Sequence, residues 1–169
     1  AQSSDAGKTW ADALTPHQDG VKAEHGFVSL LPAKDDHTSV FWLDGREMKA
    51  KQGHGHGHGP MTLRYAEVAA NGAIRNAAQL DPRVCECCQT SAAVGPDGPI
   101  VVYRDRSADE VRDIAITRLV QGSWTKPVLV CRDEWKVAGC PVNGPSIATA
   151  SSHVVVAWFT AANGKSQVK

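Results

Sequence analysis

Short runs of apolar residues, bounded by Gly, Pro, Asp and Asn, recur along the chain and predict β-strands joined by tight turns. Residues 91–103 show the pattern well: a short strand, a Pro-Asp-Gly turn and a second strand ending in Val-Val-Tyr. Asn-Gly at 71–72 and Gln-Gly at 121–122 mark two further hairpins, because Gly supplies the positive φ of a tight turn. Long helical patterns are missing, so the sequence predicts an all-β protein.

The hairpin of residues 91–103 is repeated along the chain. Residues 146–158 follow the same plan after a shift of 55 residues without a gap, and the same shift places Cys85 onto Cys140. In the second strand of a third, upstream copy, Trp42 takes the place of Tyr103 and Trp158, and Asp44 takes that of Asp105. The strands of that upstream copy are expected at residues 27–32 and 38–43.

Two of these hairpins are followed by a second hairpin, so the repeating unit has about four strands. The second hairpins are expected at residues 63–69 with a return from 74, and at residues 113–120 with a return over 124–130. Four-stranded units of this period are typical of β-propeller blades, with a β-sandwich of accidental internal similarity as the alternative. The expected divisions are the end of a blade at 1–24, full blades at 25–80 and 81–135, and the start of another at 136–169.

Two full and two partial blades do not close a propeller, which needs at least about four blades. We therefore expect the remaining blades to come from a longer chain or from an oligomer. An assembly with exposed blade edges is the less favoured alternative, because unpaired strand edges promote aggregation.

Composition excludes several classes of function. The 169 residues carry 18 Lys plus Arg and 18 Asp plus Glu, so the formal net charge is zero and argues against nucleic-acid binding through bulk charge. No apolar run approaches the roughly 18 residues of a membrane-spanning helix, so no membrane span is expected. The first residues lack the basic start and apolar stretch of a signal peptide, although one could have been removed.

The N-terminal segment carries a motif of the form Ser-x-Asp-x-Gly-x-Thr-Trp, at Ser3, Asp5, Gly7, Thr9 and Trp10. It resembles the Asp box, or BNR repeat, of sialidase-like β-propellers. In that family the motif is structural and forms the turn between the third and fourth strands of a blade. The resemblance implies that the Asp carboxylate accepts backbone N–H bonds within the turn and that the Trp packs between blades. Residues 122–124, Gly-Ser-Trp, look like a degenerate second copy.

Further stretches are similar to secreted bacterial proteins described as exo-α-sialidase-like or BNR-repeat proteins. The resemblance implies a sialidase-like propeller, a secreted or periplasmic location, and a glycan or small anionic ligand at the channel mouth. Sialidases hold a substrate carboxylate with three arginines, whose planar forks bond both of its oxygens, and add a Tyr–Glu pair and an Asp acid/base. The stretches that carry the resemblance are residues 85–90, 103–107, 112–114 and 139–145.

The densest charged cluster supplies the candidate catalytic residues, although none can be placed on a specific catalytic position of the sialidases. The Phe-Arg-Ile-Pro signature that usually carries the first sialidase arginine is absent. The alternative is a salt-bridged loop between two strands. The candidates are Arg104, Asp105, Arg106, Glu110 and Arg112.

Five cysteines allow three interpretations. They could form disulfides, for example Cys85 with Cys140, leaving Cys131 as the expected unpaired residue. They could instead remain buried free thiols. In the third interpretation, thiolates joined by an imidazole bind Cu(I) or Zn(II). The candidate ligands of that third interpretation are Cys85, Cys87, Cys88, Cys140 and His25.

His54, His56 and His58 alternate with Gly, and an extended chain would place the three imidazoles on one side. Such a run can bind Cu(II), Ni(II) or Zn(II), or it can be a low-complexity loop that binds metal only adventitiously. The sequence therefore leaves three functional hypotheses. They are a sialidase-like protein that binds or hydrolyses a glycan or other anionic ligand, a periplasmic Cu- or Zn-binding protein, and a propeller scaffold for protein partners.

Overall fold

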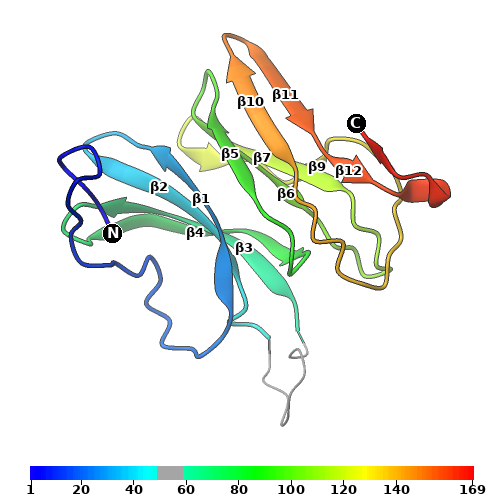
Figure 1. Cartoon of the computed structure of the whole chain (residues 1–169), viewed down its shortest axis with the longest axis horizontal. Helices are drawn as coiled ribbons and strands as arrows, with labels where there is room; N and C mark the ends of the chain where they lie inside the picture. The colour runs from blue at the N-terminus through cyan, green and yellow to red at the C-terminus, as the bar shows by residue number, and fades with distance from the viewer. Residues whose placement is uncertain (49–58) are drawn as a thin grey trace.

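The computed structural model describes residues 1–48 and 59–169, which form several antiparallel sheets (Figure 1). The expected all-β fold is confirmed. The first sheet has four strands in the order β1-β2-β3-β4, as the repeat predicts. Its strands are β1 (His25–Pro32), β2 (His37–Asp44), β3 (Met61–Ala69) and β4 (Ile74–Val84).

The second sheet has the order β5-β6-β7, and two short strands then share β7 as their partner. The expected single return strand is split because Pro127, which lies between the two pieces, has no N–H to donate to the ladder. The strands are β5 (Ser91–Val94), β6 (Pro99–Arg104), β7 (Ile114–Val120), β8 (Ser123–Trp124) and β9 (Val128–Leu129).

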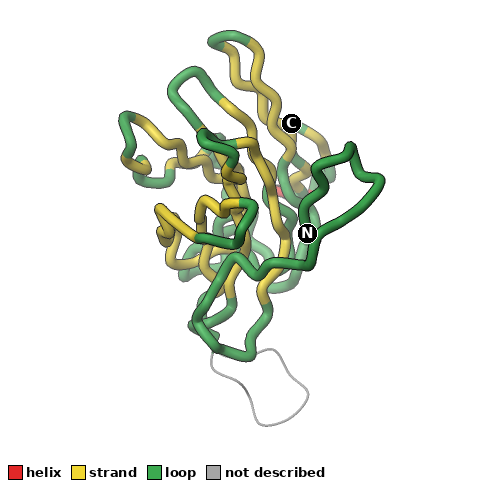
Figure 2. The backbone as a smooth tube through the Cα atoms, turned by 90° about the vertical axis from the view of Figure 1, so that its left-hand side faces the viewer, coloured by secondary structure: helices red, strands yellow, loops and turns green. Residues whose placement is uncertain are grey.

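The last part of the described chain contains two further two-stranded sheets. β10 (Ser146–Ala150) and β11 (His153–Ala157) form the hairpin expected over residues 146–158. β12 (Phe159–Thr160) pairs with β13 (Gln167–Val168) around a short 3-10 turn. Figure 2 shows strands and loops making up nearly all of the described chain. No helix in the described ranges has the length and apolar character needed to cross a membrane.

The first strands of the three hairpins lie side by side, β1 next to β5 and β5 next to β10. Side-chain bonds link them in place of a backbone ladder. The hydroxyl of Thr90 donates to the carbonyl of Phe27 at 2.7 Å, and that of Thr149 donates to the carbonyl of Val94 at 2.8 Å. Within the described residues the sheets do not close into a ring.

The main core lies between the first and second sheets. Phe41 and Tyr65 of the first sheet pack against Val101 and Tyr103 of the second, and all four are almost completely buried. Trp124 meets Phe41 edge-on at a centroid distance of 5.8 Å and Tyr65 at 4.9 Å. The Trp of the Gly-Ser-Trp segment therefore packs between two sheets, as the Asp-box comparison implies for such a residue.

The turn of residues 3–10 forms the hydrogen bonds that the resemblance to an Asp box implies. The Asp5 carboxylate accepts the backbone N–H groups of Lys8 at 3.0 Å and Thr9 at 2.9 Å, and the Thr9 hydroxyl donates to it at 2.7 Å. These bonds, led by the Thr9 N–H, lower the pKa of Asp5 to about 2. Trp10 is 66% exposed, so within the described residues it does not pack between sheets.

Candidate functional site

Two polar clusters lie at one end of the first and second sheets. Strand register joins this end together: His25 pairs with Asp44, Met61 pairs with Val84, and Val84 bridges to Asp105. The cysteine cluster consists of Cys85, Cys87, Cys88 and Cys140, with Arg104 and Arg112 beside them. The Asp44 cluster consists of His17, Asp19, His25, Asp44, Arg46 and Arg64.

Cys85 directly follows β4, and its backbone N–H donates to the carbonyl of Arg104 at 2.9 Å. Together with the isolated bridge between Val84 and Asp105, this bond links the end of β4 to the end of β6, and the Cys85 side chain lies in the interior. Cys85 and Cys88 are each 1% exposed, and their Sγ atoms lie 3.2 Å apart. Cys87 lies in a turn and holds its Sγ 3.8 Å from that of Cys85.

Cys87 and Cys140 form a disulfide, and Cys85, Cys88 and Cys131 are free. A disulfide between these two loops was expected, but the pairing of Cys85 with Cys140 is wrong. The turn at 86–87 directs Cys87 toward Cys140, while the backbone pairing of Cys85 turns its thiol inward. Cys131 is unpaired, as expected.

A close backbone contact reinforces the bridge. Any side chain at Gly144 would collide with the backbone carbonyl of Gln89, so the two loops can approach this closely only with glycine at this position. The disulfide thus fastens the loop that carries Cys140 to the loop that carries Cys87, and Gly144 leaves room for their close approach.

Arg112 reaches the buried thiols from the loop between β6 and β7. Its side chain is 2% exposed, and it donates to the Sγ of Cys85 at 3.1 Å, to Glu86 at 3.2 Å and to Glu110 at 2.9 Å. Its Nε is buried without a hydrogen-bond acceptor among the described residues. The hydrogen bond from Cys88 and the Arg112 guanidinium, acting against burial, lower the pKa of Cys85 to about 6, and the same coupling raises the pKa of Cys88.

Arg104 is 1% exposed and donates to three backbone carbonyls. The acceptors belong to Asn143 at 2.9 Å, Arg112 at 2.7 Å and Phe159 at 2.8 Å. The guanidinium also lies 5.0 Å from the ring centroid of Trp135. No carboxylate of the described chain hydrogen-bonds to this arginine, so burial lowers its pKa and the charges of the nearby cysteines oppose that shift.

The other predicted catalytic residues divide into two groups. Arg106, Glu110 and Arg112 form one network, in which Arg106 donates to Glu110 at 2.8 Å and to Glu86 at 3.1 Å. This network matches the alternative of a salt-bridged loop. Asp105 stands outside it, and burial, with other carboxylates nearby, raises its pKa to about 6.

A cavity of about 370 Å³ opens beside the cysteine cluster. Its wall contains both partners of the disulfide, the two arginines of the network and two glutamates, so it carries no excess of positive charge. The lining residues are Glu24, Glu86, Cys87, Arg106, Arg112, Ala138, Gly139 and Cys140.

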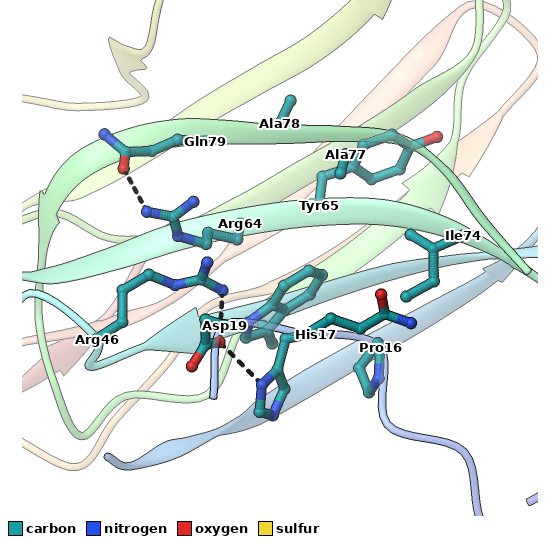
Figure 3. A pocket seen from close by; sticks show the side chains of 12 residues that line it. Pro16, His17, Asp19, Arg46, Arg64, Tyr65, Ile74, Ala77, Ala78 and Gln79 are labelled. Atoms are coloured by element: carbon teal, nitrogen blue, oxygen red, sulfur yellow. Dashed lines mark hydrogen bonds and ion pairs between the residues drawn. The ribbon is translucent and has the colours of Figure 1, made fainter. Parts of the chain in front are cut away.

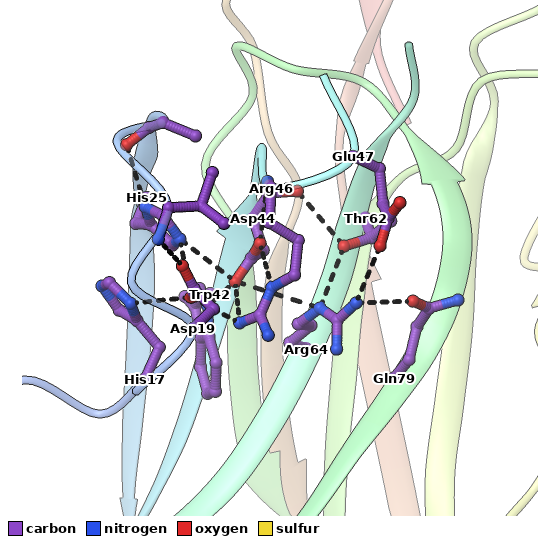
Figure 4. Close-up of polar contacts among 12 residues, drawn as sticks. His17, Asp19, His25, Trp42, Asp44, Arg46, Glu47, Thr62, Arg64 and Gln79 are labelled. Carbon is purple, nitrogen blue, oxygen red and sulfur yellow. Dashed lines mark hydrogen bonds and ion pairs between the residues drawn. The ribbon is translucent and has the colours of Figure 1, made fainter. Parts of the chain in front are cut away.

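In the Asp44 cluster, carboxylates are matched by arginines (Figure 4). Asp44 is fully buried and accepts the indole N–H of Trp42 at 2.7 Å and two N–H groups of Arg46 at 2.7 and 2.8 Å. These bonds hold the pKa of Asp44 well below its usual range although burial alone would raise it. Arg64 lies 3.9 Å from the same carboxylate, and Arg46 also contacts Asp19 at 3.0 Å.

His25 belongs to this second cluster, and the structure groups it with His17 and Asp19 rather than with the cysteines it was expected to join. The two imidazoles stack with centroids 3.8 Å apart, and both face one oxygen of Asp19, at 2.9 Å from His17 and 3.2 Å from His25. The three residues have metal-ligand spacing, but Arg46 and Arg64 already balance the charges of Asp19 and Asp44.

A cavity of about 440 Å³ lies beside the Asp44 cluster, between the N-terminal segment and the first sheet (Figure 3). Trp42 and Tyr65 supply aromatic wall, and Arg64 donates to Gln79 at 2.9 Å across its side. His17 and Asp19 contribute from the N-terminal segment.

The remaining candidate ligands, His54, His56 and His58, lie outside the described residues. Nothing in the hydrophobic pattern singles out His17 or Asp19, which precede the first strand of the repeat. Glu86 could have been predicted as a site residue from the sequence, because it is the residue enclosed by the Cys-x-Cys-Cys motif.

Comparison with known proteins adds no relative: no protein-family model matches the chain, and no curated protein is significantly similar to it. The geometry itself therefore has to indicate the chemistry. In the Asp44 cluster each charge has a partner of opposite sign. In the cysteine cluster two buried guanidinium groups adjoin two free thiols, which can become anionic ligands for a soft metal ion.

Proposed function

We propose that this chain binds Cu(I) through the thiolates of Cys85 and Cys88. The observation that carries the proposal is the pair of buried sulfur atoms, 3.2 Å apart, with an N–H of Arg112 donated to one of them at 3.1 Å. Thiolate ligands select soft ions, and a pair of adjacent thiols excluded from solvent is suited to hold one such ion.

Charge favours Cu(I) over Zn(II) at this pair. Two thiolates with Cu(I) carry one net negative charge, whereas two thiolates with Zn(II) are neutral. Arg104 is a buried cation without a carboxylate hydrogen bond in the described chain, and Arg112 touches the sulfur directly. A buried cation such as Arg104 is stabilised by an anionic neighbour, and of the two metal complexes only that of Cu(I) carries a negative charge.

The Cys87–Cys140 disulfide has a separate, structural part in this proposal. It ties the loop that holds both ligands to the segment before β10. Disulfides persist mainly in oxidising compartments, so the bridge supports the proposed secreted or periplasmic location.

The proposed setting is a segment of a sialidase-like β-propeller. Three features support it: a four-stranded first sheet, face-to-face packing of the first two sheets, and adjacent first strands β1, β5 and β10. In such a fold the loops at one end of the sheets gather around a central channel. The cysteine cluster lies in loops of this kind.

Binding of a glycan or another anionic ligand by the arginines has less support. The donors of Arg104 are committed to three carbonyls, and Arg106 and Arg112 are bonded to Glu86 and Glu110. A ligand carboxylate would have to displace these partners. That function, with its hydrolytic activity, and the protein-scaffold function stay predictions from the sequence.

The test is an anaerobic Cu(I) titration against a chromogenic Cu(I) chelator, with the Cys87–Cys140 bridge intact. The protein carries His54, His56 and His58 changed to Gln, so that the histidine run cannot contribute. We expect one tightly bound Cu(I) per chain, lost in Cys85→Ser and in Cys88→Ser. Zn(II) in excess should not displace it.

Cys131→Ser is the matched control, because this free thiol lies outside the cluster. It should leave the Cu(I) stoichiometry and affinity unchanged. Circular dichroism and thermal unfolding establish that each variant is folded. Retention of the bound Cu(I) in folded Cys88→Ser, or its loss in Cys131→Ser, would contradict the proposal.

A further inference from the structure

The four sulfurs of the cysteine cluster lie close together, and the Sγ atoms of Cys85, Cys87 and Cys88 are all within 4.8 Å of one another. Cys88 Sγ lies 3.2 Å from Cys85 Sγ, Cys85 Sγ lies 3.8 Å from Cys87 Sγ, and Cys87 is bonded to Cys140. A free thiol pair and a disulfide thus lie side by side, and every neighbouring pair of sulfurs is close to contact distance.

Solvent exposure of the cysteines rises from Cys88 and Cys85 through Cys87 to Cys140. Cys88 and Cys85 are buried, Cys87 is half-buried and Cys140 is exposed. Cys87 and Cys140 also line the 370 Å³ cavity, whereas Cys85 and Cys88 do not. A dithiol at the outer pair would therefore be open to a molecule in the cavity, while a dithiol at the inner pair is shielded from solvent.

We infer that the cluster is a thiol–disulfide exchange site in which the disulfide moves between the outer pair, Cys87–Cys140, and the inner pair, Cys85–Cys88. In the first step the Cys85 thiolate attacks Cys87 Sγ, the Cys85–Cys87 bond forms, and Cys140 leaves as a thiolate. In the second step the Cys88 thiolate, having given its proton to Cys140, attacks Cys85 Sγ and Cys87 leaves. One disulfide and two thiols are present before and after, so no oxidant is consumed.

The surroundings favour the first step. Arg112 donates an N–H to Cys85 Sγ, which stabilises the attacking thiolate. The cavity into which Cys140 is released is lined by Arg106 and Arg112 but also by Glu24 and Glu86, so the electrostatic support for the first step comes from the Arg112 contact with Cys85. The attacking and attacked sulfur atoms are 3.8 Å apart in the first step and 3.2 Å apart in the second, so both steps need only short movements of side chains.

The outer dithiol gives the site a substrate class, a small-molecule disulfide that fits the cavity. The Cys140 thiolate attacks the external disulfide, releases one external thiol and forms a mixed disulfide. Cys87 then displaces the second external thiol and restores the Cys87–Cys140 bridge. The inner dithiol has been oxidised to Cys85–Cys88, and one external disulfide has been reduced to two thiols.

This inference rests on the proposed function in one respect only. When the disulfide occupies the inner pair, Cys85 and Cys88 are no longer thiols and cannot hold Cu(I). The exchange would therefore couple metal binding to redox state, and bound Cu(I) would in turn hold the disulfide in the outer position.

Tryptic peptides report the two positions directly. The three cysteines of the motif lie in the peptide of residues 84–104, and Cys140 lies in that of residues 137–165. The outer disulfide joins these peptides, whereas the inner disulfide closes a loop within residues 84–104 and leaves the other peptide free. Metal-free protein is incubated with iodoacetamide, which traps Cys140 whenever it is released, and is then digested and mapped by mass spectrometry.

In metal-free wild-type protein we expect alkylation of Cys140 together with an internal disulfide in residues 84–104. Folded Cys85→Ser should leave Cys140 unlabelled, and Cys131→Ser should label it at the wild-type rate. Cys88→Ser should stop after the first step, with Cys140 labelled and a Cys85–Cys87 bond. In the Cys131→Ser background, oxidised glutathione should release two thiols per chain, and none when Cys85 is also changed to Ser.

Two outcomes would overturn the inference: peptides that stay joined throughout in the wild type, or alkylation of Cys85 or Cys88 before Cys140. If the exchange fails while Cu(I) still binds to Cys85 and Cys88, the proposed function survives it. If Cys140 is labelled but Cu(I) does not bind, the exchange stands and the proposed function fails. Loading with Cu(I) should slow the labelling of Cys140 when both are right.

Discussion

The Asp44 cluster and the cysteine cluster occupy the same end of neighbouring sheets, and each contains well-shielded arginines. In the first, Arg46 contacts two carboxylates, those of Asp44 at 2.7 Å and Asp19 at 3.0 Å. In the second, Arg112 donates to a sulfur as well as to Glu86 and Glu110, but Arg104 donates only to three carbonyls among the described residues. The first arrangement is complete without a ligand, whereas the second retains groups that can still take up negative charge.

Arginine content alone therefore does not indicate an anion-binding site. What matters is whether the donors already have acceptors and what those acceptors are. Carboxylate partners make a charge-neutral support, here holding the N-terminal segment against the first sheet through Asp19. Carbonyl and sulfur partners leave the cationic charge to influence the chemistry of its neighbours.

The largest effect that would test this contrast is expected from Arg104→Met. Three carbonyls, one buried and two partly buried, would lose their donor, so we expect the free energy of unfolding to fall by about 3–5 kcal/mol. Urea denaturation followed by circular dichroism measures the change. Arg118→Met, at an exposed position on β7, should change it by less than about 0.5 kcal/mol. An equal loss in both variants would mean that Arg104 does not organise the loops.

A smaller loss is expected from Asp44→Asn in the other cluster. The amide retains an acceptor for Trp42 but removes the charge that pairs with Arg46, which should cost about 2–3 kcal/mol at pH 7. The folded-state pKa of Asp44 is depressed, so its contribution is present above the unfolded pKa near 3.8 and is lost as pH falls below it. The difference between variant and wild type should therefore shrink toward pH 2.

Asp97→Asn, in an exposed turn, serves as the control for Asp44→Asn. It should leave unfolding unchanged at both pH values. A loss for Asp44→Asn that stays constant from pH 7 to pH 2 would show that the side chain acts through packing rather than charge.

The smallest effect has the opposite sign and is expected from Asp105→Asn. Burial raises the pKa of Asp105 to about 6, so the stability it provides is complete below pH 3.8 and is lost as pH rises through 6. At pH 7 the wild type carries a poorly solvated charge, and Asp105→Asn should be more stable by about 1–2 kcal/mol. Unfolding at pH 4 and pH 7 measures the gain, which should vanish at pH 4. A loss of stability at pH 7 would contradict the assigned environment of Asp105.

Much of the fold follows from local patterning. The hairpins at 27–43 and 146–158 could be predicted because apolar runs and turn residues specify strand pairs over short distances. The split of the last strand of the second sheet was not expected, although Pro127 offers the reason. The exposure of Trp10 depends on what packs against it, which a motif does not contain.

The site was less predictable, because it depends on contacts between distant loops. The Cys-x-Cys-Cys motif and the 55-residue shift indicated a link to Cys140, but a turn of two residues decides that Cys87 makes it. His25 was expected near the cysteines on the basis of its place in the repeat. Its imidazole instead contacts Asp19, a residue outside the repeating pattern. The place of His25 in the repeat fixes its backbone position, but the nearby carboxylate determines the contact of its side chain.

The interrupted outer strands have a consequence for solubility. β4 pairs with β3 through three register shifts and contains Pro82, and the outer strand of the second sheet is divided at Pro127 into β8 and β9. Neither outer edge offers another chain a long, regular row of free N–H and C=O groups. Growth by lateral addition of strands, the route to amyloid-like fibres, is therefore opposed at both outer edges, and the sheets associate through their faces instead.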